Sequence, residues 1–132
     1  MKKDRNPNRY FMIANALLLT LALSACGKQQ ETPKQPEVAT GGDPARGKDL
    51  IVKYGCKTCH TIDSIDGPNG VVGPPLNDIK SRSYIAGVLT NTPAHIQEWI
   101  MDPPKVKPGT AMPKLGVSEQ EAQDIAAFLY SQ

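Results

Sequence analysis

The chain has few aromatic residues, few cysteines and no hydrophobic run long enough for a comfortable membrane span. Aromatic residues make up only 5% of the 132 residues, whereas there are 12 prolines and 11 glycines. This composition favours short helices joined by ordered loops over a sheet protein. A small domain with a modest apolar core would also gain stability from an inserted apolar body.

Most of the positive charge lies near the N-terminus. The whole chain has 15 basic and 13 acidic side chains and a formal net charge of +2. Four of these basic residues and one acidic residue belong to residues 1–25. Without that segment 11 basic and 12 acidic side chains remain, so the net charge becomes −1. A nucleic-acid partner is therefore not indicated.

Residues 1–25 predict a bacterial lipoprotein signal peptide. A basic start precedes an apolar run of about 14 residues, from Tyr10 to Leu23, which is short for a membrane span. The tetrapeptide LSAC that ends at Cys26 resembles the lipobox, whose cysteine is lipidated and becomes the first residue of the mature protein. The alternatives are an uncleaved signal anchor and an ordinary signal peptide with an incidental thiol. We expect Cys26 to carry a lipid anchor in the bacterial cell envelope, facing the periplasm or the cell exterior.

Residues 26–42 predict the lipidated cysteine followed by a disordered tether. This stretch is polar, contains two prolines and offers nothing to bury. A flexible chain of about 16 residues spans roughly 20 to 24 Å on average. Residues 43–132 remain to form the folded domain.

The pentapeptide CKTCH, from Cys56 to His60, is the most informative motif. Two thiols three residues apart, followed at once by histidine, are typical of covalent haem attachment. Both sulfurs can then reach one edge of the porphyrin, and His60 can present a ring nitrogen to the iron. The alternatives are a thioredoxin-like pair and half of a zinc site. The chain has no βαβ pattern for the first, and only Cys26 and His95 remain as ligands for the second.

Capping residues and apolar periodicity predict an all-α domain of three to four short helices and ordered loops wrapped around one covalent haem. Asp43, Thr92 and Ser118 are helix N-caps, the last of them in a capping box. We see no convincing pair of strands. The expected helices cover Pro44 to Tyr54, Ser83 to Leu89, Pro93 to Met101, and Ser118 to Leu129.

The second axial ligand of the iron has three candidates, Met101, Met112 and His95. Met112 lies in the segment PGTAMP, whose two prolines stiffen the backbone and would hold a weak thioether ligand in place. Met101 falls on a predicted helix, where core packing is the commoner role. His95 falls on the first turn of that helix and is expected to be solvated. We predict that Met112 is the ligand.

Residues 43–132 resemble the class I bacterial monohaem cytochromes c. The motifs that carry this resemblance are Gly47, CKTCH, the GPPL that begins at Gly73, WIMDP, PGTAMP, and IAAFL in the last helix. The resemblance implies one haem c bound covalently through Cys56 and Cys59. It also implies that the Pro74 carbonyl accepts the His60 Nδ1 proton.

Further contacts follow from the same resemblance. Arg82 and Thr110 match positions that hold haem propionates, and Asn91 is a further candidate for that role. Trp99 matches an aromatic residue beside the methionine ligand. Gly47 and Phe128 match the crossing point of the terminal helices. The segment Thr61 to Val72 departs from the family pattern by lengthening the loop before Gly73.

Two axial protein ligands, His60 and Met112, would leave no iron coordination site open to a substrate. We therefore expect a one-electron carrier and not an enzyme, a monomer that passes electrons between donor and acceptor complexes of a respiratory chain. The alternatives are an electron-relay subunit of a stable oxidase or reductase complex, and an open-site haem enzyme or gas sensor. Candidates for a docking rim facing an acidic partner are Lys57, Lys80, Lys105, Lys107 and Lys114.

Overall fold

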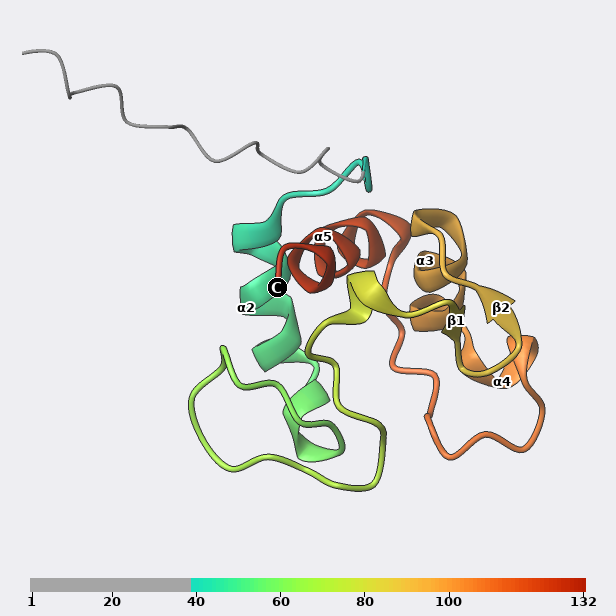
Figure 1. The fold of residues 1–132 in the computed structure, drawn as a ribbon, viewed down its shortest axis with the longest axis horizontal. Coiled ribbons are helices and arrows are strands. Elements are labelled where there is room, and N and C mark those ends of the chain that lie inside the picture. The colour runs from blue at the N-terminus through green and yellow to red at the C-terminus, as the bar shows by residue number, and fades with distance from the viewer. Residues whose placement is uncertain (1–38) are drawn as a thin grey trace, which may run out of the picture. The chain divides into compact units, whose positions relative to one another are not determined.

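The computed structural model describes residues 39–132, which form a mostly helical domain (Figure 1). The predicted signal peptide, the predicted lipidation site Cys26 and most of the predicted tether lie outside these residues. The all-α prediction is confirmed in its main part. The elements are α2 (Pro44–Lys53), η1 (Cys56–Thr58), η2 (Ile79–Ser81), β1 (Tyr84–Ile85), β2 (Leu89–Thr90), α3 (Pro93–Met101), α4 (Pro103–Val106) and α5 (Glu119–Tyr130).

The three longer helices begin at the predicted caps. The Asp43 side chain accepts hydrogen bonds from the backbone N–H of Ala45 and Arg46, and Thr92 accepts one from His95 N at 3.2 Å. Ser118 forms the expected capping box at the start of α5. Among residues 39–132, no helix is long and apolar enough to cross a membrane.

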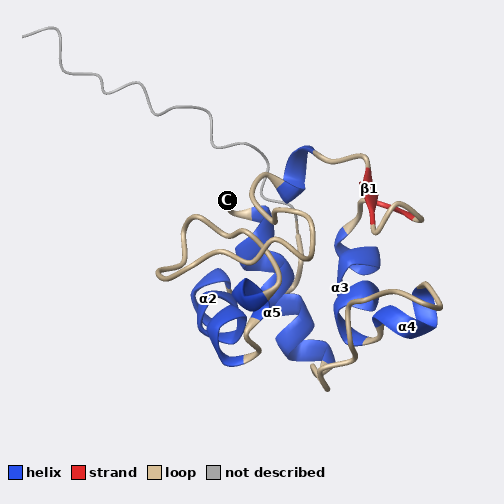
Figure 2. Cartoon of the chain, turned by 90° about the horizontal axis from the view of Figure 1, so that it is seen from below, coloured by secondary structure: helices blue, strands red, loops and turns tan. Residues whose placement is uncertain are grey.

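Helix α5 lies between α2 and α3, and α2 crosses it where the sequence predicted (Figures 1 and 2). A Cβ on Gly47 would lie 2.0 Å from Asp124 O and 2.8 Å from Phe128 Cβ, so only glycine allows this approach. Next to it, Arg46 Nε donates to Asp124 Oδ2 at 2.9 Å. Asp124 is buried, and the Arg46 hydrogen bond lowers its pKa.

The prediction of a helix from Ser83 to Leu89 is wrong, as is the expectation of no strand pair. Strands β1 and β2 pair antiparallel with Ile85 opposite Leu89. Between them Ala86 and Gly87 both have positive φ, 52° and 73°. Consecutive residues with positive φ suit a tight hairpin turn and cannot belong to a right-handed helix.

The sequence also did not predict α4. Asp102 ends α3 as expected, but its side chain then accepts a hydrogen bond from Lys105 N at 3.3 Å and so caps a new short helix. Lys114 Nζ lies 2.5 Å from the other carboxylate oxygen of Asp102. This ion pair fixes the loop after α4 to the end of α3, and the Lys114 hydrogen bond lowers the Asp102 pKa.

Candidate haem site

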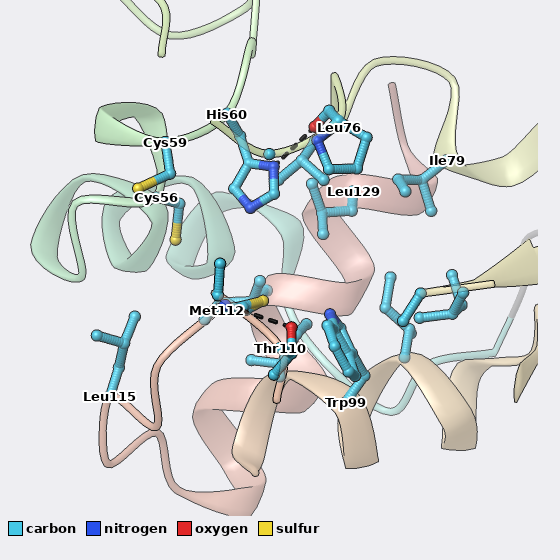
Figure 3. A pocket seen from close by; sticks show the side chains of 18 of the residues that line it. Cys56, Cys59, His60, Leu76, Ile79, Trp99, Thr110, Met112, Leu115 and Leu129 are labelled. Carbon is cyan, nitrogen blue, oxygen red and sulfur yellow. Dashed lines mark hydrogen bonds between the residues drawn. The ribbon is translucent and has the colours of Figure 1, made fainter. Parts of the chain in front are cut away.

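A cavity of about 480 Å³ opens between α5, α3 and the loops on either side of them. Its lining residues are mostly apolar and include eight of the predicted site residues. Figure 3 shows Cys56, Cys59 and His60 on one side of this cavity and Trp99, Thr110 and Met112 across from them. The remaining two lining residues among those predicted are Pro74 and Arg82.

A left-handed turn brings the two cysteines to the cavity. Gly55, at φ 64°, ends the run of α2, and the 3₁₀ turn η1 follows directly. Cys56 O accepts hydrogen bonds from Cys59 N at 3.2 Å and from His60 N at 3.0 Å. Both cysteines of this compact turn line the same cavity, and both thiols are free. Burial raises the pKa of the Cys56 thiol to about 11.

The His60 ring is held from behind by a carbonyl group. His60 Nδ1 lies 2.7 Å from Pro74 O, as the resemblance implied. Because a carbonyl oxygen only accepts, Nδ1 carries the proton and Nε2 keeps its lone pair for a metal. A Cβ on Gly73 would lie 2.3 Å from His60 Cε1 and 2.5 Å from Nδ1. A glycine at position 73 is therefore required for the ring to take this place.

Met112 reaches the cavity from a constrained loop. Thr110 N donates to Lys107 O at 3.1 Å, and the Thr110 hydroxyl accepts from Met112 N at 3.3 Å. Gly109 supplies the positive φ, 82°, that the turn needs. In Figure 3 the Met112 sulfur lies across the cavity from the His60 ring.

The two rival ligands lie elsewhere. Neither Met101 nor His95 is among the residues that line the cavity. Met101 packs against the hydrophobic core. The expectation that His95 is solvated is wrong in part, since it is half-buried and its Nδ1 lies 2.8 Å from Thr90 O of β2. Within residues 39–132, Met112 is thus the candidate that faces His60.

These residues fit a covalently bound haem. An imidazole nitrogen and a thioether sulfur, both iron ligands, face the cavity from opposite sides, and two thiols lie beside the imidazole. Isoleucines from α2, α3 and α5 supply apolar walls: Ile51, Ile96, Ile100 and Ile125. In the described part of the chain no three His, Cys, Asp or Glu side chains gather to hold a bare metal ion.

Asn91 is hydrogen-bonded within the protein, and a contact to a haem propionate stays a prediction for it. It does not line the cavity. Its Nδ2 donates to Ile79 O at 2.7 Å and to Arg82 O at 2.8 Å, and its Oδ1 accepts from the Tyr130 hydroxyl. Its amide hydrogens and its oxygen are thereby committed to holding the loop on α5. The sequence does not predict these bonds, because they join Asn91 to the η2 turn and to α5.

Arg82 does line the cavity, but its guanidinium also binds the neighbouring loop. Arg82 Nη2 donates to Pro75 O, the carbonyl next to the one that holds His60. A contact to a haem propionate remains a prediction for Arg82 and for Thr110.

Three of the five lysines of the predicted docking rim make contacts within the protein, and the rim itself stays a prediction. Lys57 Nζ donates to Ile62 O at 2.9 Å and to Ile65 O, so this ammonium supports a loop. Lys107 Nζ donates to Ala86 O at 3.2 Å, and Lys114 is paired with Asp102. Sequence reasoning missed the exposed apolar side chains at the cavity margin, because exposure has no local signal. They are Val72, Tyr84 and Leu115.

Comparison with known proteins agrees with this site. Residues 44–132 match the protein family described as Cytochrome c. The chain is 30% identical over 87 residues to cytochrome c oxidase subunit 2 of Alkalihalophilus pseudofirmus, and the match covers 65% of this chain but only 25% of that protein. The chain therefore spans about a quarter of the length of this curated relative. Cytochrome c2 from Rhodobacter capsulatus has 28% identity and a TM-score of 0.52, and the match covers 68% of this chain and 97% of that one.

Proposed function

We propose that this chain, which belongs to the cytochrome c family, is an electron carrier with a covalently bound haem c, and that His60 and Met112 are the two axial ligands of its iron. The observation that carries the ligand assignment is the placement of these two side chains across one cavity. The competing side chains, Met101 and His95, do not line that cavity.

The site residues account for electron transfer without substrate chemistry. When bound, haem supplies an iron that gains and loses one electron. His60 offers its Nε2 lone pair while Pro74 O holds the opposite ring nitrogen, so the imidazole is fixed in orientation. Met112 offers a soft thioether, a ligand that favours ferrous iron and raises the reduction potential. The apolar walls exclude water from the centre of the site.

We further propose that the carrier is held at a bacterial membrane by a lipid on Cys26. The lipobox-like tetrapeptide supports this, together with the 16 residues between Cys26 and Asp43. Residues 1–25 would be the signal peptide, residues 26–42 the tether and residues 43–132 the electron-carrying domain. Its partners would then be the donor and acceptor complexes of a respiratory chain on the outer side of the cytoplasmic membrane.

One observation favours a second arrangement, in which the chain relays electrons inside a stable oxidase or reductase complex. Its relative in Alkalihalophilus pseudofirmus is named as an oxidase subunit. A free carrier should separate from the respiratory complexes when membranes are dissolved in mild detergent. A relay subunit should instead purify with its complex.

A redox titration with a carbon monoxide challenge tests the ligand assignment. We expect a one-electron Nernst curve and no binding of carbon monoxide to the reduced native protein, because both axial positions are filled. Ready binding of carbon monoxide without displacement of a ligand would contradict the assignment. It would favour an open-site haem enzyme or gas sensor.

A further inference from the structure

Residues 57–61, which include most of CKTCH, run beside residues 70–76, at the far end of the loop that departs from the family pattern. Three backbone hydrogen bonds of 2.8 to 2.9 Å join the two segments, from Gly70 N to Lys57 O, from Gly73 N to Cys59 O and from Leu76 N to Thr61 O. His60 lies between the second and third bonds on one segment, and Pro74 lies between them on the other. This ladder of bonds therefore decides where the Pro74 carbonyl stands relative to the His60 ring.

Asp63 and Asn77 close the ladder with a reciprocal pair of hydrogen bonds. Asp63 N donates to Asn77 Oδ1 at 3.0 Å, and Asn77 Nδ2 donates to Asp63 Oδ2 at 2.7 Å. The remaining carboxylate oxygen of Asp63 accepts from Asn69 Nδ2 at 3.2 Å. One carboxylate thus holds both the middle and the end of the loop, and hydrogen bonds to a charged acceptor are the stronger kind.

The rest of the loop is fixed as well. Ile62 and Ile65 are 1% and 6% exposed and belong to the hydrophobic core. Their carbonyl groups accept hydrogen bonds from the Lys57 ammonium. Asn69 Oδ1 accepts from Ile62 N at 3.1 Å. The loop is therefore held in a fixed conformation next to the haem site, and Asp63 joins its start to Asn69 and Asn77.

We propose that Asp63 is a positioning residue for His60, acting through Asn77 and the Pro74 carbonyl. This role rests on the proposed function, in which His60 ligates the iron. A hydrogen bond to the outer nitrogen of a ligating imidazole fixes the ring and raises its basicity. Without the Asp63 carboxylate, the hydrogen bond from Asn77 Nδ2 is lost next to the Leu76–Thr61 bond. The Pro74 carbonyl is then held less firmly.

The test follows deuterium exchange of the His60 Nδ1 proton by NMR in the haem-loaded protein. We expect Asp63→Ala and Asn77→Ala each to speed this exchange about tenfold. The double variant should exchange no faster than either single one, because the two residues act as a unit. Asp66→Ala is the matched control, since Asp66 is exposed in the same loop and has no hydrogen-bond partner within residues 39–132. It should exchange at the wild-type rate.

The possible outcomes separate this role from the proposed function. Unchanged exchange in both single variants would overturn the positioning role and leave His60 as a ligand. Additive effects in the double variant would also contradict it, because Asp63 and Asn77 would then act independently. If Asp63→Ala does not accumulate with haem, Asn77→Ala carries the test, because it keeps the carboxylate. A wild-type protein without iron-shifted His60 ring protons would refute the ligand assignment, and the positioning role with it.

Discussion

Gly47 of α2 and Asp124 of α5 approach so closely that no side chain fits between them. A Cβ at Gly47 would lie 2.0 Å from Asp124 O. Helix α2 leads directly into the CKTCH turn, and α5 contributes Ile125 and Leu129 to the cavity wall. The crossing of the two helices therefore sets the spacing between the haem-attachment turn and the wall opposite it.

Replacing Gly47 by alanine tests this crossing. We expect Gly47→Ala to lower the free energy of unfolding by about 2 kcal/mol, because the added methyl group forces the helices apart. Alanine has the better helix propensity by about 1 kcal/mol, so the sign of the change is informative. Denaturant unfolding measures it, with the exposed neighbour Lys48→Ala as the control. Equal or higher stability of Gly47→Ala would show that the helices do not need this approach.

Gly73→Ala should displace the His60 ring. The new Cβ would lie 2.3 to 2.9 Å from three ring atoms of His60, a distance that no packed side chain tolerates. We expect the hydrogen bond to Pro74 O to be lost and the iron-shifted His60 proton signals to move in the NMR spectrum. Val71→Ala, at a nearby exposed position that does not line the cavity, should leave these signals in place. Wild-type His60 signals in Gly73→Ala would mean that the backbone yields instead of the ring.

Acid should weaken the hydrogen bonds that join Glu121 of α5 to Lys53 and Tyr54 at the end of α2. Glu121 accepts hydrogen bonds from Lys53 Nζ at 2.6 Å and from the Tyr54 hydroxyl at 2.7 Å. The Lys53 bond is the main cause of a Glu121 pKa lowered from 4.5 to about 2. Since the folded-state pKa is the lower one, this carboxylate stabilises the fold fully above about pH 4.5 and loses its contribution as the pH falls to about 2.

The corresponding variant is Glu121→Gln. It should be less stable than the wild type at pH 7, and the difference should shrink towards zero as unfolding is measured at pH values approaching 2. Glu119→Gln, in the same first turn of α5, should show no such trend. A stability difference that is independent of pH would mean that the Glu121 charge does not contribute.

Membrane attachment is tested by Cys26→Ser. Without the thiol no lipid can be added, so we expect the protein to move from the membrane fraction to the soluble fraction of the cell envelope. Immunoblotting of the two fractions measures this. Continued attachment would point to an uncleaved apolar segment, and release together with a loss of haem would point to a failure of export.

The sequence predicted those parts of the fold whose cause is local. Asp43, Thr92 and Ser118 cap helices because their side chains reach the next few N–H groups. The motifs CKTCH and PGTAMP bring His60 and Met112 to the cavity. What the sequence missed depends on partners far along the chain. Ile85, Val88 and Leu89 have helical spacing and so predict a helix where the structure has the turn at Ala86.

The features that the sequence does not predict depend on hydrogen bonds to residues beyond the local helix or turn. Asn91 binds Ile79, Arg82 and Tyr130, and Lys57 turns back onto the carbonyls of the following loop. The residues next to Asn91 and Lys57 in the sequence do not indicate these hydrogen-bond partners. The contacts of the rim lysines have the same origin, because the sequence does not show which carbonyl group a lysine side chain meets.

The most direct measurement is the methionine-to-ferric-iron charge-transfer absorption in Met112→Ala and Met101→Ala. Met101 is the matched control, because it packs against the core and does not line the cavity. We predict that the band is lost in Met112→Ala, which then binds carbon monoxide when reduced, and that it persists in Met101→Ala. A normal band in Met112→Ala, or its loss only in Met101→Ala, would contradict ligation of the iron by His60 and Met112.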